Sequence, residues 1–201
     1  MTQSAPRRRK RPAIASPHRD ANVERVLITE DRIARRVRQL ARRIERDFTG
    51  RDLVIVAVLD GTIIFLADLM RHLSCSPRFD FIGVSSYRGS TRPGALTVTK
   101  ELRLGLRDRD VLVVDDILDS GRTLRLVLAR VRKLRPRRVR VCVLLEKTTR
   151  RRERVCVHYV GFRIPNRFVV GYGLDFAERC RNLPFVGILR PECHRTGEHP
   201  S

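Results

Sequence analysis

The chain has 201 residues, and its 43 Lys and Arg against 22 Asp and Glu give a net charge of +21 at pH 7. This length suits one domain whose core can bury roughly 70% of the surface of the unfolded chain, so a small disulfide-stapled fold is not expected. No window is apolar enough to predict a membrane span or a secretory signal, and the dispersed cysteines, without a Cys-x-x-Cys pair, favour a reducing, cytoplasmic setting.

The positive charge is concentrated in residues 1–51 and 130–154. A clustered basic excess can be a nucleic-acid footprint, or it can attract a polyanionic substrate. Arginine exceeds lysine throughout the chain, however, even where no cluster is formed. We therefore favour the interpretation of an arginine-rich solvated surface, and we expect no nucleic-acid partner.

The N-terminal quarter of the chain predicts an arm followed by a helix. Residues 1–22 are rich in Arg, Pro, Ala and Ser, which is typical of a disordered basic arm. Apolar residues then recur at helical spacing from Ile33 to Phe48. Thr29 or Asp31 is the predicted N-cap of this helix, and Gly50 is its predicted end.

The next segment predicts two strands around an apolar helix. The β-branched run 53–59 is typical of a strand buried on both faces, and residues 60–62 (Asp-Gly-Thr) then turn into the helix 63–73. Residues 79–87 alternate well enough for a second strand. The segment 88–96 is rich in Gly, Pro and Ser and predicts a mobile loop.

The remaining pattern continues the alternation of strands and helices. Residues 97–104 predict a more exposed strand, and residues 110–116 another buried one. A helix is predicted from Leu124 until Pro136 ends it. Further strands are predicted at 139–145 and, as short pieces, around 155–161, 168–170 and 185–189. The alternation indicates an α/β fold with a mostly parallel, doubly wound sheet.

One stretch, VLVVDDILDSGRTL from Val111 to Leu124, combines three acids with a loop of small residues. In open α/β sheets ligands bind at the carboxyl ends of the strands, and the N-terminus of the following helix attracts an anion. The side chains and amides of residues 120–123 therefore predict a cradle for a monophosphate. They do not form a Walker loop, whose pattern the sequence lacks.

The acids of this stretch need a different partner from phosphate. Asp115 and Asp116 can accept hydrogen bonds from a vicinal diol, directly or through the waters of a metal ion. Asp119, at the mouth of the turn, can take or give a proton. A ligand that carries phosphate, diol and a reacting ring carbon would satisfy the whole stretch. Solvated strand-end charges and a receiver-type acid pair are the alternatives, although receivers carry that pair on their first strand.

The same stretch resembles the 5-phosphoribosyl-1-diphosphate (PRPP) signature of type I phosphoribosyltransferases. Within this family, further stretches are similar to the hypoxanthine-guanine phosphoribosyltransferases. They are VLDGTIIFLADLMRHL, DFIGVSSY, VLLEKTT and VGFRIPNRFVVGYGLDFAERCRNLPFVGIL. Together the matched stretches lie between Thr29 and Leu189, which is most of the folded chain.

The resemblance implies a type I phosphoribosyltransferase fold: a mostly parallel twisted sheet flanked by helices, with a small hood from the N- and C-terminal segments. It implies a domain over 23–190, between the disordered arm 1–22 and a flexible tail 191–201. The implied activity is purine salvage, the Mg²⁺-dependent transfer of 5-phosphoribose from PRPP to hypoxanthine and guanine. The products would be IMP, GMP and pyrophosphate, and the enzyme would be a homo-oligomer, either a dimer or a tetramer.

The resemblance also implies roles for individual residues. It makes Asp119 the general base beside N7 of the purine and residues 120–123 the 5′-phosphate loop. The implied PRPP and nucleotide contacts are Asp115, Asp116, Ser120, Gly121, Arg122, Thr123, Asp60, Gly61 and Arg181. The implied purine contacts are Lys147, Phe168 and Val169, the start of the lid is Ser86 and Tyr87, and the residues near Mg²⁺ are Asp175, Asp115 and Asp116.

Two residues depart from the pattern of the family. Asp60 stands where many members have a basic residue at the pyrophosphate, which bears on the affinity for pyrophosphate. The peptide at this place in the family can be cis and can use its backbone amide. Glu146, beside Lys147, could tune that lysine or point outward.

Two alternatives stay open at this stage. The first is the same chemistry with xanthine preferred, because few side chains distinguish the oxopurines. Lys147 would donate to the 6-oxo group of any of them and would face the amine of adenine unfavourably. The second is a regulator that keeps the same fold and binds RNA through the basic segments. The sequence motif of such regulators differs after the acid pair.

Overall fold

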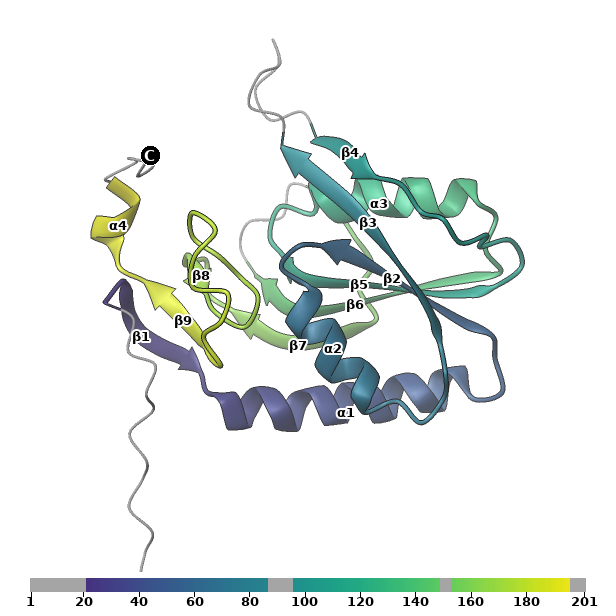
Figure 1. The fold of residues 1–201 in the computed structure, drawn as a ribbon, viewed down its shortest axis with the longest axis horizontal. Helices are drawn as coiled ribbons and strands as arrows, with labels where there is room; N and C mark the ends of the chain where they lie inside the picture. The colour runs from purple at the N-terminus through teal and green to yellow at the C-terminus, as the bar shows by residue number, and fades with distance from the viewer. Residues whose placement is uncertain (1–20, 87–95, 149–152, 196–201) are drawn as a thin grey trace, which may run out of the picture.

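The fold is built around a six-stranded sheet (Figure 1). The computed structural model describes residues 21–86, 96–148 and 153–195. The strands of this sheet are β2 (Leu53–Leu59), β3 (Arg78–Ser86), β4 (Leu96–Lys100), β5 (Asp110–Leu118), β6 (Arg138–Lys147) and β7 (Tyr159–Ile164). Their order is β4-β3-β2-β5-β6-β7, and all neighbours are parallel except β3 and β4. The predicted α/β fold with a mostly parallel sheet is confirmed.

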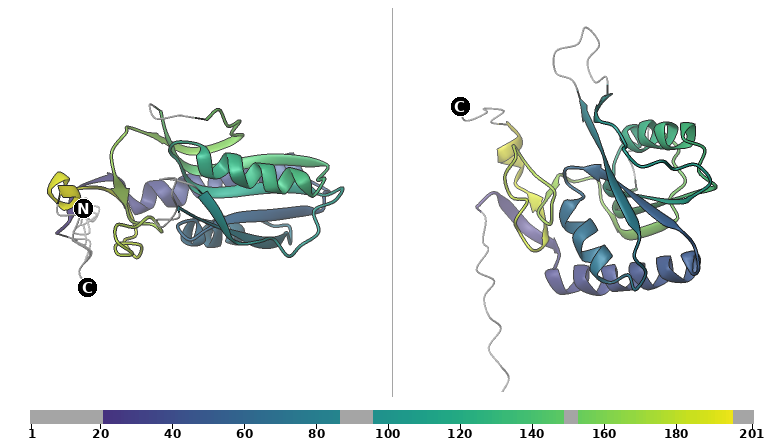
Figure 2. Two further views of the ribbon diagram at one scale, coloured as in Figure 1. Left: turned by 90° about the horizontal axis from the view of Figure 1, so that it is seen from above. Right: turned by 45° about the vertical axis from the view of Figure 1, so that its right-hand side comes forward.

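Helices cover both faces of this sheet. Helices α1 (Glu30–Phe48) and α2 (Ile63–Arg71) lie on one face, and α3 (Arg122–Lys133) lies on the other (Figures 1 and 2). Side chains of β2 alternate between the two cores, since Ile55 packs on the side of α1 and α2 whereas Val56 packs on the side of α3. This burial on both faces explains the continuous apolar run of β2. Among the described residues no helix is long and apolar enough to cross a membrane.

A second, smaller sheet forms the hood. It consists of β1 (Val23–Ile28), β9 (Val186–Leu189) and β8 (Val169–Val170), paired antiparallel in that order. Figure 1 shows the hood on the side toward which the arrowheads of the central parallel strands point. The short helix α4 (Pro191–Arg195) follows β9, within the segment predicted as a tail. The predicted hood of N- and C-terminal segments is confirmed.

Several element bounds differ from the sequence predictions for reasons of pairing. Strand β1 was not predicted, because most of its side chains are exposed and only its pairing with β9 makes it a strand. The strand predicted at 155–161 lies at 159–164 instead, where Tyr159 pairs with Cys142 of β6. The imidazole of His158 accepts a hydrogen bond from the amide of Val141 just before that pairing begins (3.1 Å).

The strand predicted at 97–104 ends at Lys100, because the backbone amides beyond it donate to the side chain of Asp80 and not to a neighbouring strand. The amides of Arg103 and Leu104 donate to one carboxylate oxygen of the buried Asp80, at 2.5 and 2.9 Å. Lys100 approaches the other oxygen at 3.2 Å. Burial by itself raises the pKa of Asp80, but these hydrogen bonds outweigh it and hold the pKa below its usual value. The alternation of apolar and polar residues therefore continues past the end of β4, into a loop whose backbone is fixed by hydrogen bonds to Asp80.

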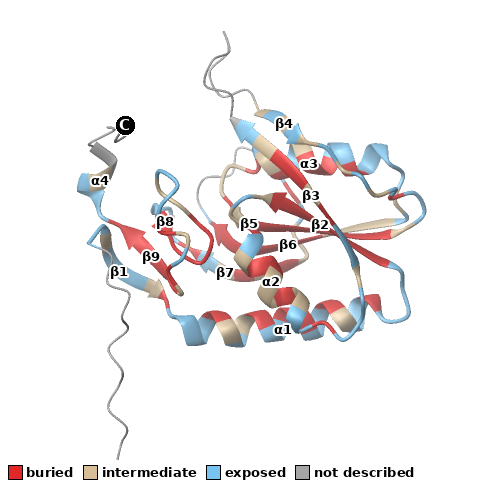
Figure 3. Ribbon diagram, viewed as in Figure 1, coloured by how far each residue is buried: buried red, intermediate tan, exposed pale blue. Residues whose placement is uncertain are grey.

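The red ribbon segments of Figure 3 show how this core is distributed. Buried residues run along the central strands and along one stripe of α1, which faces the sheet. The stripe contains the apolar residues that predicted the helix, namely Ile33, Val37, Leu40, Ala41, Ile44 and Phe48. Thr29 precedes the helix in an extended conformation and accepts the amide of Ile33 on its carbonyl at 3.0 Å. The predicted N-cap position is confirmed, although the Thr29 side chain does not cap.

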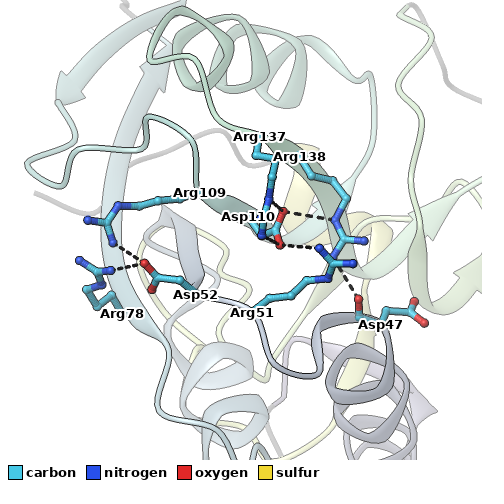
Figure 4. A network of polar contacts seen from close by, with 8 residues as sticks. All are labelled: Asp47, Arg51, Asp52, Arg78, Arg109, Asp110, Arg137 and Arg138. Atoms are coloured by element: carbon cyan, nitrogen blue, oxygen red, sulfur yellow. Dashed lines mark hydrogen bonds and ion pairs between the residues drawn. The ribbon is translucent and has the colours of Figure 1, made fainter.

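The amino-terminal edge of the sheet is held by a buried carboxylate among arginines (Figure 4). Asp110, the first residue of β5, is fully buried and accepts from Arg137 Nε at 3.1 Å and Nη2 at 2.5 Å. Arg51 and Arg138 each lie 3.6 Å from it. Burial raises the pKa of Asp110, but the Arg137 hydrogen bond and the three guanidinium charges bring it below the usual value. The carboxylate therefore joins the turn after α1 to the starts of β5 and β6.

We expect Asp110→Asn to lower the free energy of unfolding by about 2 kcal/mol near neutral pH, because it removes a charge-assisted hydrogen bond from a buried site. Since the folded pKa lies below the unfolded one, this stabilisation is present above the unfolded pKa of about 3.9 and is lost as the pH falls through the folded pKa. Urea denaturation of both proteins from about pH 7 down to about pH 2 measures the difference.

The matched control is Asp52→Asn, because Asp52 also binds two arginines, Arg78 and Arg109, but has a side chain that is 56% exposed. Its loss is expected to change the free energy of unfolding by less than about 1 kcal/mol. The structural role of the Asp110 carboxylate is wrong if the two variants lose equal stability. It is also wrong if the difference in unfolding free energy between wild type and Asp110→Asn does not shrink in acid.

Candidate active site

A cavity of about 380 Å³ lies at the carboxyl ends of β2, β5 and β6 and is bounded by the hood segment. Of the predicted site residues, it is lined by Asp60, Gly61, Asp115, Asp116, Asp119, Ser120, Gly121, Thr123, Lys147, Phe168, Val169, Asp175 and Arg181. The exposed Arg122 begins α3 and does not line the cavity. Ser86 is the last residue of β3, and Tyr87 lies outside the described residues.

Two carboxylates end the apolar run of the central strand. Asp115 is only 5% exposed, and its Oδ1 accepts from Thr62 Oγ1 at 3.5 Å and from the Asp116 amide at 3.0 Å. Asp116 Oδ1 accepts from the Ile117 amide at 2.7 Å. Burial, and then the charge of Asp116, raise the pKa of Asp115 well above its usual value, and burial also raises the pKa of Asp116. Bound hydroxyl donors or a nearby cation would favour the ionised pair.

The turn after β2 packs directly on this pair. A Cβ atom on Gly61 would lie 1.8 Å from Asp116 Oδ2, so any other residue at this position would have to displace the Asp116 carboxylate. The Leu59–Asp60 peptide is cis, as the family resemblance allowed. Asp60 itself is exposed at the edge of the cavity. Thr62, which binds Asp115 and is 1% exposed, is a site residue that the sequence analysis missed.

The turn between β5 and α3 is the segment that the sequence analysis predicted to be a phosphate cradle. Gly121 precedes the helix with φ of 83°, and a Cβ there would lie 2.7 Å from the carbonyl oxygen of Glu153. The amide of Glu153 donates to the Ser120 carbonyl at 3.1 Å and fixes the turn from outside. The first turn of α3 contains no acidic residue, and its N-cap Gly121 has no side chain to cap it, although the amide of Arg122 donates to Ser120 Oγ at 3.4 Å. Its amides and the positive end of its dipole can therefore serve an anion.

The cavity is also lined by an ion pair between a buried lysine and a partly exposed aspartate. Lys147 Nζ lies 2.9 Å from Asp119 Oδ2, and the two side chains are 7% and 34% exposed. The neighbouring strands β5 and β6 place these residues side by side, since Leu118 pairs with Glu146. Glu146 does not point outward, because it is 2% exposed and accepts from Arg163 Nε at 2.9 Å. A lysine donor and a carboxylate acceptor thus face the cavity together.

The hood segment supplies the remaining wall. Phe168 is 41% exposed, and its ring meets that of Phe176 edge-on with centroids 5.8 Å apart. The Arg181 guanidinium donates to the Gly173 carbonyl at 2.7 Å and pairs with Asp175 at 2.9 Å. Gly173, with φ of 99°, packs against the backbone of Gly61. This residue was not identified from the sequence. The closely spaced glycines of the Gly-Tyr-Gly sequence at 171–173 were the available signal.

The acids of the cavity do not form a complete metal site by themselves. Among the described residues, no group of three or more His, Cys, Asp or Glu side chains is arranged to hold a metal ion. Mg²⁺ usually keeps several waters and binds through one or two carboxylates together with substrate phosphates. The carboxylates of Asp175 and of the Asp115–Asp116 pair, which line the cavity, fit that mode of binding.

Comparison with known proteins places this geometry in a family. The phosphoribosyl transferase domain matches residues 26–177. The hypoxanthine-guanine phosphoribosyltransferases of Mycobacterium avium and Bacillus subtilis (strain 168) are 41% and 36% identical, over 87% of this chain and 89% and 98% of their own. The bifunctional protein TilS/HprT of Listeria monocytogenes is 41% identical over 89% of this chain, which spans 28% of that longer protein.

Solved structures agree with these relatives. A hypoxanthine-guanine phosphoribosyltransferase from Bacillus anthracis has a TM-score of 0.78 and 39% identity, over 84% of this chain and 98% of its own. A hypoxanthine phosphoribosyl transferase of Trypanosoma cruzi has a TM-score of 0.82 and 35% identity, over 89% and 97% of the two chains. The chain therefore belongs to the phosphoribosyl transferase family and, within it, to the hypoxanthine-guanine phosphoribosyltransferases.

Proposed function

We propose that the protein transfers 5-phosphoribose from PRPP to hypoxanthine and guanine, giving IMP, GMP and pyrophosphate. The observation that carries this proposal is that three kinds of chemical group line one cavity. They are the predicted anion cradle in the turn before α3, the Asp115–Asp116 pair and the Lys147–Asp119 pair. A nucleotide has a phosphate, a diol and a base to match them.

In this proposal the pyrophosphate lies at the turn of residues 60–62 and at Arg181. The reaction forms the bond between N9 of the purine and C1′ and breaks the bond between C1′ and pyrophosphate. Asp119 accepts the proton released from N7 of the purine. Fixed donors at the departing pyrophosphate stabilise the charge that develops there. Ser86 and Tyr87 are proposed to begin a lid that excludes water while C1′ carries positive charge.

We assign the base site to Lys147, Phe168 and Val169. The ammonium group of Lys147 would donate to the 6-oxo group, and Phe168 offers an exposed ring for stacking. Because Lys147 also holds Asp119 at 2.9 Å, recognition of the base and placement of the general base depend on one ion pair. Lysine cannot accept a hydrogen bond, so the amine of adenine would find no partner there.

Mg²⁺ is the proposed cofactor, and when bound it would neutralise negative charge on the pyrophosphate. Asp175 would hold it on the hood side, and Asp115 and Asp116 would contact it through water or through the ribose hydroxyls. Asp60 brings an additional negative charge to this end of the cavity, where many relatives have a basic residue. We therefore propose that the pyrophosphate is held by backbone amides of residues 60–62 and by Arg181, and not by a side chain at position 60.

Incubation of the protein with PRPP and Mg²⁺ tests the function directly. Hypoxanthine, guanine, xanthine, adenine and uracil are supplied one at a time, and nucleotide formation is followed. We expect turnover with hypoxanthine and guanine and none with uracil. Absence of turnover with every oxopurine would contradict the proposal, and a clear preference for xanthine would change its substrate.

Asp119→Asn is expected to lower kcat by about 100-fold or more, because positioned proton transfer typically contributes that much. The affinity for IMP, measured by calorimetry, should change far less, since the cradle and the acid pair are intact. Asp108→Asn is the control, because Asp108 is an aspartate with a side chain that is 87% exposed, near the opposite edge of the sheet. A kcat within twofold of the wild-type value would remove Asp119 from the proposed role.

Lys147→Gln is expected to lower kcat/KM for hypoxanthine and guanine by roughly 10- to 100-fold, the usual range for a lost charged hydrogen bond. The ratio of hypoxanthine turnover to adenine turnover should fall at the same time, because the glutamine amide can also accept a hydrogen bond from the amine of adenine. Lys133→Gln, at the exposed end of α3, is the control. An unchanged ratio would show that Lys147 does not read the 6-oxo group.

A further inference from the structure

A buried tyrosine lies directly behind the pyrophosphate end of the cavity. Tyr172 is 5% exposed and stands between Gly171 and Gly173, and all three residues have positive φ, of 95°, 52° and 99°. Its hydroxyl donates to Asp68 Oδ2 on α2 at 2.6 Å. Burial first, and then the hydrogen bond to Asp68, raise the pKa of Tyr172, so the hydroxyl remains a donor over the physiological range.

The backbone around Tyr172 carries groups of the proposed pyrophosphate site. The amide of Tyr172 donates to the Leu183 carbonyl at 2.8 Å, and the amide of Gly173 donates to the Arg181 carbonyl at 3.0 Å. The Gly173 carbonyl in turn accepts from the Arg181 guanidinium at 2.7 Å. The position of the Arg181 side chain therefore depends on where the backbone of Gly173 lies.

The partner of Tyr172 is tied to the other half of the same site. Asp68 lies on α2, and this helix begins immediately after the turn of residues 60–62. Gly173 packs so closely on that turn that a Cβ on it would lie 2.1 Å from the Gly61 carbonyl oxygen. Gly61 packs in turn against Asp116. The hydrogen bond thus joins two chain segments that also meet where the backbones of Gly61 and Gly173 pack together.

We propose that Tyr172 and Asp68 are positioning residues that hold the Gly171–Arg181 segment against the turn of residues 60–62 and so set the geometry of the pyrophosphate site. This inference rests on the proposed function. Neither side chain lies in the cavity lining, so neither contacts the substrate itself. The expected signature is a change in the handling of PRPP that leaves the handling of the purine as it was.

A second tyrosine provides a matched control for a merely structural contribution. Tyr159 is 1% exposed, and its hydroxyl donates to Asp47 Oδ2 of α1 at 2.7 Å. The hydrogen bonds of Tyr159 and Tyr172 are therefore alike: each joins a buried tyrosine hydroxyl to an aspartate on a helix, at 2.7 and 2.6 Å. Tyr159 is the first residue of β7, pairs with Cys142 in the middle of β6, and does not line the cavity. Loss of either hydroxyl leaves an aspartate that solvent can reach, since Asp47 is exposed and the Asp68 side chain is 39% exposed.

The experiment compares wild type, Tyr172→Phe and Tyr159→Phe by steady-state kinetics with PRPP and hypoxanthine varied in turn, and by thermal unfolding. We expect Tyr172→Phe to raise KM for PRPP by about three- to tenfold, the change that loss of one hydrogen bond typically produces, with KM for hypoxanthine unchanged. Tyr159→Phe should lower Tm to a similar extent and leave both KM values at the wild-type level.

The acceptor is tested separately. Asp68→Asn keeps an oxygen that can accept from Tyr172, so KM for PRPP should stay near the wild-type value, whereas Asp68→Ala should match Tyr172→Phe. The double variant Tyr172→Phe, Asp68→Ala should show no further increase, as expected of two partners in one contact.

The outcomes separate this inference from the function on which it rests. If the wild-type protein forms no nucleotide in this assay, the proposed function is wrong. If the wild type is active but Tyr172→Phe leaves KM for PRPP unchanged, or raises it no more than Tyr159→Phe does, the positioning role is wrong while the function stands. If KM for hypoxanthine rises equally, the pair does not act on the pyrophosphate site selectively, which also overturns the inference.

Discussion

The active site depends on two carboxylates near the carboxyl end of β5, where Asp115 is buried and Asp116 is partly buried. Burial of a carboxylate costs free energy unless hydrogen bonds or a cation offset it. Within the protein, Thr62 and the amides of Asp116 and Ile117 supply only part of that compensation to Asp115 and Asp116. The diol of a ribose or a hydrated cation would supply the rest. The need for a ligand is therefore built into the strand itself.

The two ends of β5 use buried acids in opposite ways. At the amino end Asp110 is surrounded by Arg51, Arg137 and Arg138, and its charge is balanced within the fold (Figure 4). These arginines come from both basic segments of the sequence, so part of the large positive charge has a structural purpose at this edge. At the carboxyl end the charge of the acid pair is left for a substrate. Solvated arginine surface, together with this cluster, is sufficient to explain the basic composition.

The sequence predicted the parts of the fold that depend on local patterns. Local pattern was enough to predict β2 and β5 from their β-branched runs and α1 from its apolar stripe. The stretch from Asp115 to Thr123 likewise predicted a site at the end of a strand. Contacts made by pairing could not be predicted. Strand β1 has no regular alternation of apolar and polar residues, and the hydrogen bonds of Thr62 with Asp115 and of Tyr172 with Asp68 join residues 53 and 104 positions apart. Such contacts become visible only when the sheet order is known.

We propose that one nucleotide lies along the turn after β5, with its phosphate at α3 and its base at Lys147. A crystal structure of the protein with IMP and Mg²⁺ measures this most directly. We predict that the phosphate accepts hydrogen bonds from the amides of residues 120–123, that the ribose hydroxyls contact Asp115 and Asp116, and that the 6-oxo group contacts Lys147. A nucleotide bound in the reverse direction, or away from the Asp115–Asp116 pair, would contradict the account.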